Sequence, residues 1–551
     1  MARIIWLAAA AGAAVLTAAV SAAETPKPEA AVWRLDLAKA LPGGKAMEVY
    51  LETAGGRFVR AFALAPQFNQ VPHDVDASGL ALDGPAVRGD LAVTVHSDGF
   101  VPPPGQSVKA AYRLQARVEG DGVTGTFEGV YGGLAGGVLG EKMTGAVAGA
   151  LAATPLFHGP VLVDLHMENA EGEVPSGKAA WGQRGFASFI FKDGRAVHAL
   201  IRGHGGNPIN YFEAAVTAAD LAWKDGALAG TARVKSTKNE EYVYTFKGQV
   251  IGDRIGGAFE KTYNGRSVQG GRFRGTVSAV PEVPADRALY YLELHGAVPG
   301  GKQLMLHLPA SGGALKQGAG FAGTFNHTYH DADASGLKRE GDALAGTVRV
   351  TMNPDPYVPP DHRPVACTYD IKAAVRDGGV TGAFTGTFGG RDVAGTVLGR
   401  LRPQPPVPEP VRVNVKLDNG VCDGPPWHRR CYIGFTAAKG RADAGGFSNN
   451  KGGFQGRFKS AIVRFDGAAF KATIEAVVET SGSVKKGDYT FLLAGKVVGG
   501  ELVGKVDTIL NGQPAKQGTD FMGSFGPAKQ EAQTKNDESR ATDDESKDKE
   551  Q

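Results

Sequence analysis

The sequence is poor in cysteine and, after its first residues, has no long apolar run. Three cysteines occur in 551 residues. Cys422 and Cys431 are separated by eight residues, so they are predicted to close a hairpin loop as a disulfide, with Cys367 left as a small buried thiol. Because no later stretch reaches eighteen apolar residues, no membrane span is expected in the mature chain.

The chain also has no large excess of either acidic or basic residues. The formal net charge is +3 over the whole chain, and no concentrated basic stripe is present, which excludes nucleic acid as a partner on electrostatic grounds. No Gly-x-Ser-x-Gly, His-Glu-x-x-His or Cys-x-x-Cys motif occurs, so nothing indicates a catalytic centre or a bound cofactor other than a divalent ion. Two carboxylates can still converge from distant strands, which leaves a polysaccharide hydrolase as an alternative.

The N-terminus has the pattern of an export signal. Residues 1–23 comprise Met-Ala-Arg, an apolar run from Ile4 to Val20, and the small residues Ser21, Ala22 and Ala23. This pattern predicts a cleaved signal peptide and a periplasmic or extracellular product. No Cys follows the apolar run, so a lipid anchor is not expected. At the other end, residues 528–551 carry eight acidic and five basic residues, which predicts a disordered tail.

Between these ends the sequence repeats four times. The opening strands are spaced about 125 residues apart and begin near Trp33, Val161, Leu289 and Val411. Each copy also has a hairpin with an Asp-Gly or Gly-Asp turn. A Tyr follows, at Tyr112, Tyr244, Tyr369 and Tyr489, and in the first three copies a Phe lies fifteen residues later. We predict β modules at residues 31–151, 158–279, 286–402 and 411–526, with Pro-rich linkers before the third and fourth modules.

The fold class follows from this pattern. Apolar residues alternate with polar ones at period two, short Gly turns join the strands, and helical spacing is not sustained after the signal. The prediction is an all-β protein of four tandem antiparallel meander modules. Each is expected to be a small up-and-down barrel or a two-sheet sandwich, and the sequential hairpins favour the barrel.

Modules 1 and 3 share a segment that modules 2 and 4 lack. It reads Phe68-Asn-Gln-Val-Pro-His-Asp-Val-Asp-Ala-Ser-Gly-Leu in one and Phe325-Asn-His-Thr-Tyr-His-Asp-Ala-Asp-Ala-Ser-Gly-Leu in the other. This predicts duplication of a module pair in the order A-B-A-B. The chemistry-bearing residues are His73, Asp74 and Asp76 in module 1, and His330, Asp331 and Asp333 in module 3.

Two interpretations of this His-Asp-x-Asp segment are open. The carboxylates alternate with an apolar residue and face one side of an extended segment, where with the imidazole they would bind Ca²⁺ or another divalent ion, or hydrogen-bond a sugar. Alternatively, Asp-Ala-Ser-Gly is a turn in which the Asp side chain bonds its own downstream backbone, and this is the simpler interpretation. Trp427, beside Arg429 and Arg430 inside the predicted disulfide loop, is a further candidate ligand contact.

The function predicted from these features is that of an exported, non-catalytic binding or cell-envelope protein. Carbohydrate is the expected ligand, because repeated modules raise avidity for repetitive polysaccharides. An envelope protein is the alternative partner, and a structural role in spacing or linking envelope components is the alternative function.

Overall fold

The computed structural model describes most of the chain between the predicted signal peptide and the tail. The described residues are 31–98, 101–102, 106–132, 140–155, 157–171, 183–205, 214–236, 239–284, 287–311, 314–323, 325–326, 328–354, 363–423, 426–449 and 454–528. The predicted signal peptide, 1–23, and the tail beyond residue 528 lie outside these ranges.

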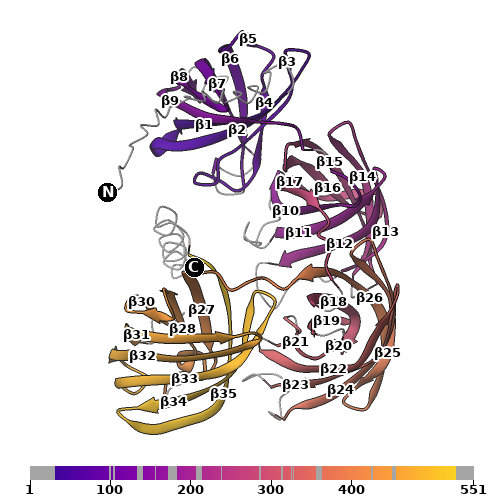
Figure 1. Ribbon diagram of the computed structural model, residues 1–551, viewed down its shortest axis with the longest axis vertical. Coiled ribbons are helices and arrows are strands. Elements are labelled where there is room, and N and C mark those ends of the chain that lie inside the picture. Colours follow the sequence, from indigo (N-terminus) through magenta and orange to yellow (C-terminus); the bar gives the residue numbers. More distant parts are fainter. Residues whose placement is uncertain are drawn as a thin grey trace, which may run out of the picture. The chain divides into compact units, whose positions relative to one another are not determined.

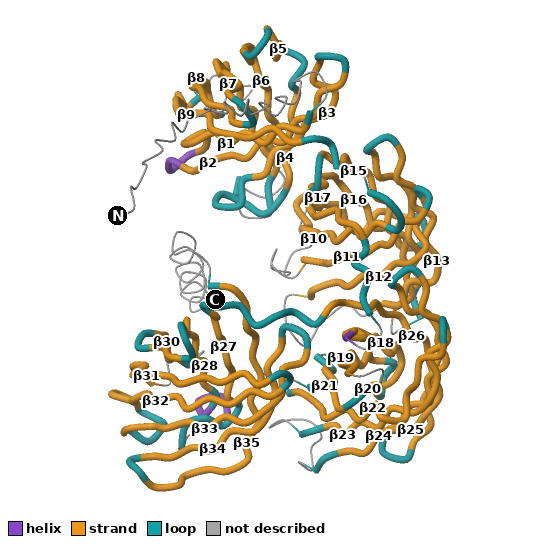
Figure 2. The backbone as a smooth tube through the Cα atoms, viewed as in Figure 1, coloured by secondary structure: helices purple, strands orange, loops and turns teal. Residues whose placement is uncertain are grey.

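The described chain is almost entirely β-structure, in four antiparallel sheets that follow one another along the sequence (Figures 1 and 2). They occupy residues 32–152, 161–279, 288–403 and 411–527. Two short helical elements are described, the 3-10 turn η1 (Pro42–Gly44) and α1 (Pro426–Arg429). The predicted fold class, all-β with four tandem meander modules, is therefore confirmed.

The first two modules contain seventeen strands. Module 1 contains β1 (Val32–Leu41), β2 (Lys45–Ala54), β3 (Arg57–Leu64), β4 (Pro72–Asp76), β5 (Leu80–Asp83), β6 (Ala86–His96), β7 (Ser107–Glu119), β8 (Gly122–Tyr131) and β9 (Glu141–Ala152). Module 2 contains β10 (Val161–Glu171), β11 (Gln183–Lys192), β12 (Arg195–Gly205), β13 (Ala214–Lys224), β14 (Ala227–Ser236), β15 (Glu241–Ile251), β16 (Arg254–Tyr263) and β17 (Arg266–Ala279).

The last two modules follow the same plan. Module 3 contains β18 (Ala288–Val298), β19 (Lys302–Ser311), β20 (Ala314–Leu315), β21 (Gln317–Phe321), β22 (Tyr329–Glu340), β23 (Ala343–Met352), β24 (Val365–Arg376), β25 (Gly379–Phe388) and β26 (Arg391–Pro403). Module 4 contains β27 (Val411–Leu417), β28 (Cys431–Ala437), β29 (Arg441–Ala442), β30 (Gly445–Ser448), β31 (Phe454–Asp466), β32 (Ala469–Ser481), β33 (Gly487–Val498), β34 (Glu501–Leu510) and β35 (Gln513–Pro527).

The sheets close into barrels, as the sequential hairpins predict. Module 2 is a closed barrel in strict chain order from β10 to β17. In module 3 the pairing of β18 with β19 completes a ring, and in module 1 the pairing of β4 with β6 does the same. In module 4 the described strands form a nine-stranded sheet that is nearly closed, with β27 between β28 and β35. Closure removes the open edges that would otherwise invite pairing with another chain.

The repeated Tyr and Phe form part of each core. Tyr112 and Phe127 meet edge to face at 5.5 Å, and Tyr369 and Phe384 do so at 5.6 Å. The Tyr112 hydroxyl donates to the Ala40 carbonyl at 2.7 Å, just before the Pro-Gly-Gly turn of η1. Tyr369 makes the same bond to Ala297 at 3.1 Å. The hydroxyl of the repeated Tyr thus makes the same buried hydrogen bond in modules 1 and 3.

The predicted Asp-Gly hairpins are also present. Asp225 and Gly226, between β13 and β14, have φ of 50° and 70°. A two-residue turn with positive φ at both positions matches the right-handed twist of the flanking strands, and Gly and Asp tolerate that conformation.

The described chain divides into two compact units. Unit 1 comprises residues up to Phe68 with 74–94 and 108–155, and unit 2 comprises 69–73, 95–107 and everything from Leu156 onward. Modules 2, 3 and 4 therefore belong to one unit. No helix among the described residues is both long and apolar enough to span a bilayer.

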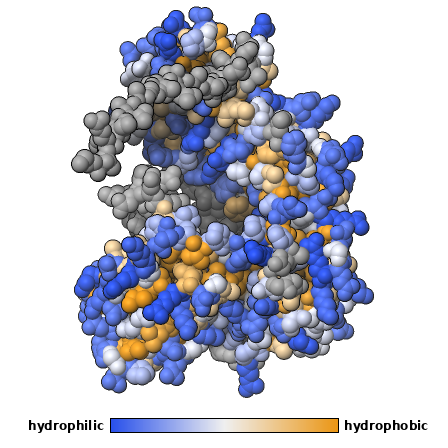
Figure 3. All heavy atoms as spheres, in the orientation of Figure 1, coloured by the Kyte–Doolittle hydropathy of each residue, from blue (hydrophilic) through white to orange (hydrophobic). Residues whose placement is uncertain are grey.

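Most apolar side chains are inside the barrels, and the face in Figure 3 is largely hydrophilic with hydrophobic patches. Scattered exposed apolar residues are normal on a protein surface. Phe186, which is 49% exposed, is of interest because it borders the cleft described next.

Candidate functional site

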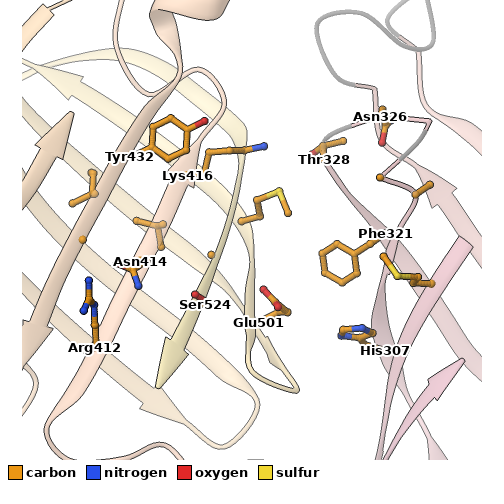
Figure 4. A pocket seen from close by; sticks show the side chains of 18 of the residues that line it. His307, Phe321, Asn326, Thr328, Arg412, Asn414, Lys416, Tyr432, Glu501 and Ser524 are labelled. Carbon is orange, nitrogen blue, oxygen red and sulfur yellow. The ribbon is translucent and has the colours of Figure 1, made fainter. Parts of the chain in front are cut away.

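Unit 2 contains a cleft of about 1020 Å³ where modules 2, 3 and 4 meet. Module 2 contributes Phe186 and Arg202, and the two facing walls come from module 3 and module 4. In Figure 4 these walls lie on opposite sides of the open space, with His307 and Phe321 on one and Tyr432 and Asn414 on the other. The volume lies at the upper end of the range for small-molecule sites, which suits an extended ligand.

The wall from module 3 is a strip of rings across three strands. Tyr291 on β18 lies opposite His307 on β19, and their ring centroids are 5.1 Å apart. His307 in turn lies 5.1 Å from Phe321 at the end of β21. This arrangement follows from pairing, because side chains on one face of neighbouring strands come within contact distance. The three rings lie along the module 3 side of the cleft.

A buried carboxylate anchors the strip. Glu293 is 1% exposed and lies 2.5 Å from Arg202 of module 2. It also accepts a hydrogen bond from the Tyr291 hydroxyl at 3.0 Å and contacts His295 Nε2 at 3.1 Å. Burial alone would raise the pKa of Glu293, but Arg202 and His295 outweigh it and lower the pKa to about 2. Arg202 also lies 4.5 Å from the Tyr291 ring centroid, so modules 2 and 3 are locked together at this point.

The wall from module 4 is the outer face of β27 and its neighbours. The alternation in Val411-Arg-Val-Asn-Val-Lys-Leu buries the three Val side chains in the barrel and turns Arg412, Asn414 and Lys416 outward. Pairing then places Ser524 and Gly434 on either side of Asn414, and Tyr432 beside Lys416.

Glycine shapes the centre of this wall. A Cβ at Gly434 would lie 2.8 Å from Asn414 Oδ1, and at Gly446 on the next strand it would meet open space. The pair leaves a flat area beside Asn414 and Tyr432.

A small apolar cluster joins modules 3 and 4 beside the cleft. Leu289, Ala319 and Tyr329 of module 3 pack with Val498 and Val503 of module 4. The contact is reinforced by Lys496, whose Nζ lies 3.2 Å from Asp331 and donates to the Gly318 carbonyl at 3.3 Å.

The buried polar atoms of the lining include two without a hydrogen-bond partner among the described atoms. Thr328 is 3% exposed, and its Oγ1 has no hydrogen-bond partner among the described atoms; the same is true of His307 Nδ1. Burial, with the positive charge of Arg202 nearby, lowers the pKa of His307 to about 4, so the ring is neutral at pH 7. Glu501 is the one carboxylate among the described lining residues, and burial raises its pKa.

The sequence-predicted histidines lie elsewhere, as buried residues of the scaffold. His73 and His330 are both 0% exposed. His73 Nδ1 accepts the His96 backbone N–H at 3.2 Å, and His330 Nδ1 accepts that of Asn353 at the same distance. Since β4 alternates, His73 faces the interior while Asp74 and Asp76 are exposed. The imidazole and the carboxylates therefore do not converge.

The carboxylates of the motif occupy equivalent positions in the two modules: Asp76 corresponds to Asp333, and Asp74 to Asp331. Asp76 accepts the Ser78 N–H at 2.9 Å and Asp333 accepts the Ser335 N–H at 3.0 Å. The hydroxyl and N–H of that Ser lower the pKa of each Asp. This is the turn interpretation of the motif.

Asp74 and Asp76 line a second pocket of about 510 Å³ in unit 1, together with Lys109, whereas Asp331 pairs with Lys496. The described residues contain no group of three or more His, Cys, Asp or Glu that would hold a metal. Divalent-ion binding therefore stays a prediction.

Two further predicted features lie in module 4. Trp427 is in α1, but its side chain is outside the described part of the structure. Cys422 and Cys431 are both buried in the module 4 core as free thiols. Their disulfide stays a prediction for the oxidised protein.

The cleft residues themselves were missed by the sequence analysis. They lie on strands whose alternation was recognised, but whose outward residues gave no sign of facing another module. One signal was present in β18: apart from Glu293, Leu289-Tyr-Tyr-Leu-Glu-Leu is apolar on both faces, which is typical of a strand covered on both sides. Of its eleven residues, the first seven are buried.

Comparison with known proteins gives little further information. No protein-family model and no curated protein sequence matches this chain. Among solved structures, it is similar to a crystal structure of a double mutant of the vaccine antigen transferrin binding protein B from Haemophilus parasuis Hp5. The two are 10% identical over 91% of this chain and 96% of that chain, with a TM-score of 0.16. A TM-score this low does not establish a shared fold.

Proposed function

We propose that this chain is an exported, non-catalytic binding protein of the cell envelope, and that the cleft of unit 2 holds a carbohydrate. The observation that carries the proposal is the pairing of the aromatic strip of module 3 with the polar wall of module 4. Sugar rings offer apolar faces to aromatic side chains and hydroxyls to amides and hydroxyls. Phe321 and Tyr432 supply the rings, and Asn414 and Ser524 the hydrogen-bonding groups.

The cleft is also suited to binding without rearrangement. Most of its lining lies on barrel strands, and contacts on both sides hold its modules together: Arg202 with Glu293 and Lys496 with Asp331. A preformed site loses less entropy on binding than one that must order itself.

The lining is less suited to hydrolysis. Glycoside hydrolysis by the usual mechanisms needs two carboxyl groups about 5 to 10 Å apart. Among the described lining residues Glu501 has no second carboxylate as a partner in the cleft. The binding function is therefore favoured over the hydrolase.

The test is a calorimetric titration of the mature full-length chain with soluble oligosaccharides. Phe321→Ala and Tyr432→Ala should each weaken binding by about tenfold, which corresponds to about 1.4 kcal/mol. Tyr263→Ala is the matched control, because Tyr263 is a partly buried tyrosine of module 2 that does not line the cleft. Equal binding by all variants, or no binding of any oligosaccharide by the folded wild type, would overturn the proposal and favour a structural role.

A further inference from the structure

The cleft carries more positive charge than its surroundings neutralise. Its described lining includes four cations, Arg202, Arg402, Arg412 and Lys416, against the single carboxylate Glu501. Two of the cations have acidic partners outside the lining: Arg202 pairs with Glu293 and Lys416 with Asp418 at 3.3 Å.

The other two cations have no such partner. In the described part of the chain neither Arg402 nor Arg412 forms an ion pair. The Arg402 guanidinium lies 5.2 Å from the Tyr291 ring centroid, a cation–π contact that leaves its N–H groups able to bind an anion. Arg412 stands on the module 4 wall beside Asn414 (Figure 4).

These two arginines are held at a fixed separation. Arg402 lies near the end of β26 and Arg412 near the start of β27, and the Pro-rich linker joins these two strands. The linker is attached to module 4 along its length: Gln404 Oε1 accepts the Gly499 N–H at 3.4 Å, Glu409 accepts the Lys439 N–H at 2.5 Å, and Val407 packs against the core. A stiff, docked linker fixes the backbone positions of both arginines, which lowers the entropy lost when a ligand binds.

We infer that the ligand of the cleft is an acidic carbohydrate, one whose sugar rings bear carboxylates that Arg402 and Arg412 bind. This inference rests on the proposed function and narrows its substrate class. Guanidinium groups bind carboxylates through paired N–H donors, an interaction that a neutral sugar cannot make. The aromatic strip and the flat wall around Asn414 bind the ring faces and hydroxyls of the same chain.

The experiment compares matched ligands in which a methyl ester removes the negative charge of each carboxylate. Uronate oligosaccharides of one length, from galacturonan, mannuronan and a glucuronate-containing polymer, are titrated into the mature full-length chain beside their methyl esters. The acid form of at least one should bind about tenfold more tightly than its ester, and this preference should shrink as salt is raised.

Variants then assign the preference to the two arginines. Arg402→Gln and Arg412→Gln should each weaken binding of the acid more than binding of the ester, so that the preference for the acid shrinks. Arg117→Gln, which removes an exposed charge from unit 1, is the control and should have no effect.

The outcomes separate the two proposals. Equal binding of acid and ester, or a preference that survives both substitutions, overturns the acidic ligand while leaving carbohydrate binding in place. Failure of both forms of every oligosaccharide to bind overturns carbohydrate binding itself, and the acidic ligand with it.

Discussion

The first two strands of modules 1 and 3 pair in the same register, but the residues on their outer faces differ in chemistry. In module 1, Arg34 pairs with Tyr50 and Asp36 with Glu48 across β1 and β2; the equivalent pairs in module 3 are Tyr291 with His307 and Glu293 with Met305 across β18 and β19. The module 1 face carries charges that reach solvent, with Arg34 3.4 Å from Glu48.

The module 3 face is instead covered by its neighbours. It packs against module 2 through Tyr291 and Arg202 and lines the cleft through His307. The inward residues are apolar in both modules, and the Tyr-to-carbonyl bond is the same. The two modules thus share the barrel but differ on this outer face, which in module 3 lines the candidate site.

The largest contrast is expected at the equivalent acids. Glu293→Ala should destabilise unit 2 by about 3–5 kcal/mol, because it leaves the Arg202 guanidinium without its buried counter-ion. Asp36→Ala should change stability by no more than about 0.5 kcal/mol, since the Asp36 side chain is only partly buried and lies at the surface. Differential scanning calorimetry measures both. Similar losses from the two substitutions would contradict the claim that only the module 3 face is an interface.

Acid should affect the two carboxyls in opposite directions. The folded pKa of Glu293 is lowered to about 2, so its stabilisation is present above its ordinary pKa of 4.5 and is lost as pH falls from there toward 2. A shift of this size corresponds to about 3 kcal/mol. Burial raises the pKa of Asp36, so ionised Asp36 disfavours folding and acidification relieves that effect.

Melting curves from pH 6 to pH 3 test this difference. Glu293→Gln should flatten the loss of stability on acidification, whereas Asp36→Asn should steepen it slightly. A steeper loss in Glu293→Gln than in wild type would show that the carboxylate is not stabilised by Arg202 in solution.

Substitutions at the Tyr hydrogen bond that modules 1 and 3 share should have equal effects on stability. Tyr112→Phe and Tyr369→Phe each remove one buried hydrogen bond, to Ala40 and Ala297, and should each cost about 1 kcal/mol. Hydrogen exchange of the amides around each Tyr measures the loss within its own module. A large difference between the two variants would mean that the modules differ in their cores as well as on their surfaces.

The smallest effect is expected at the contact between modules 3 and 4. Lys496→Met removes the ion pair with Asp331, in which both side chains are partly exposed, and should cost about 0.5 kcal/mol. Lys109→Met is the control in module 1, where Lys109 donates to Thr94 at 2.6 Å rather than to a carboxylate. In limited proteolysis, the Pro-rich linker between modules 3 and 4 should be cleaved slightly faster in Lys496→Met than in the control. Faster cleavage in the control would contradict the prediction.

The sequence was sufficient to predict four antiparallel β modules and to favour barrels over sandwiches, but not to predict the cleft. Alternation, Asp-Gly turns and the repeated Tyr are local signals, and Tyr112, Asp225 and Gly226 lie where those signals predict. The His-Asp-x-Asp segment is also a local signal. His73 accepts a backbone N–H, and Asp76 accepts the N–H of Ser78 within a turn, so both residues have structural roles.

The cleft depends instead on which outer faces meet. Arg412 and His307 belong to different modules, and nothing in the strand pattern of either one specifies the other. Arg402 and Arg412 flank a linker that was recognised as a boundary, yet their shared role follows only from how that linker docks.

The most direct test of the account is a crystal structure of the mature chain with the oligosaccharide it binds most tightly. We predict density for a sugar between the aromatic strip, at Phe321, and the module 4 wall, at Tyr432, with a carboxylate at Arg402 or Arg412. Density in the unit 1 pocket at Asp74 and Asp76, with the cleft empty, would contradict it.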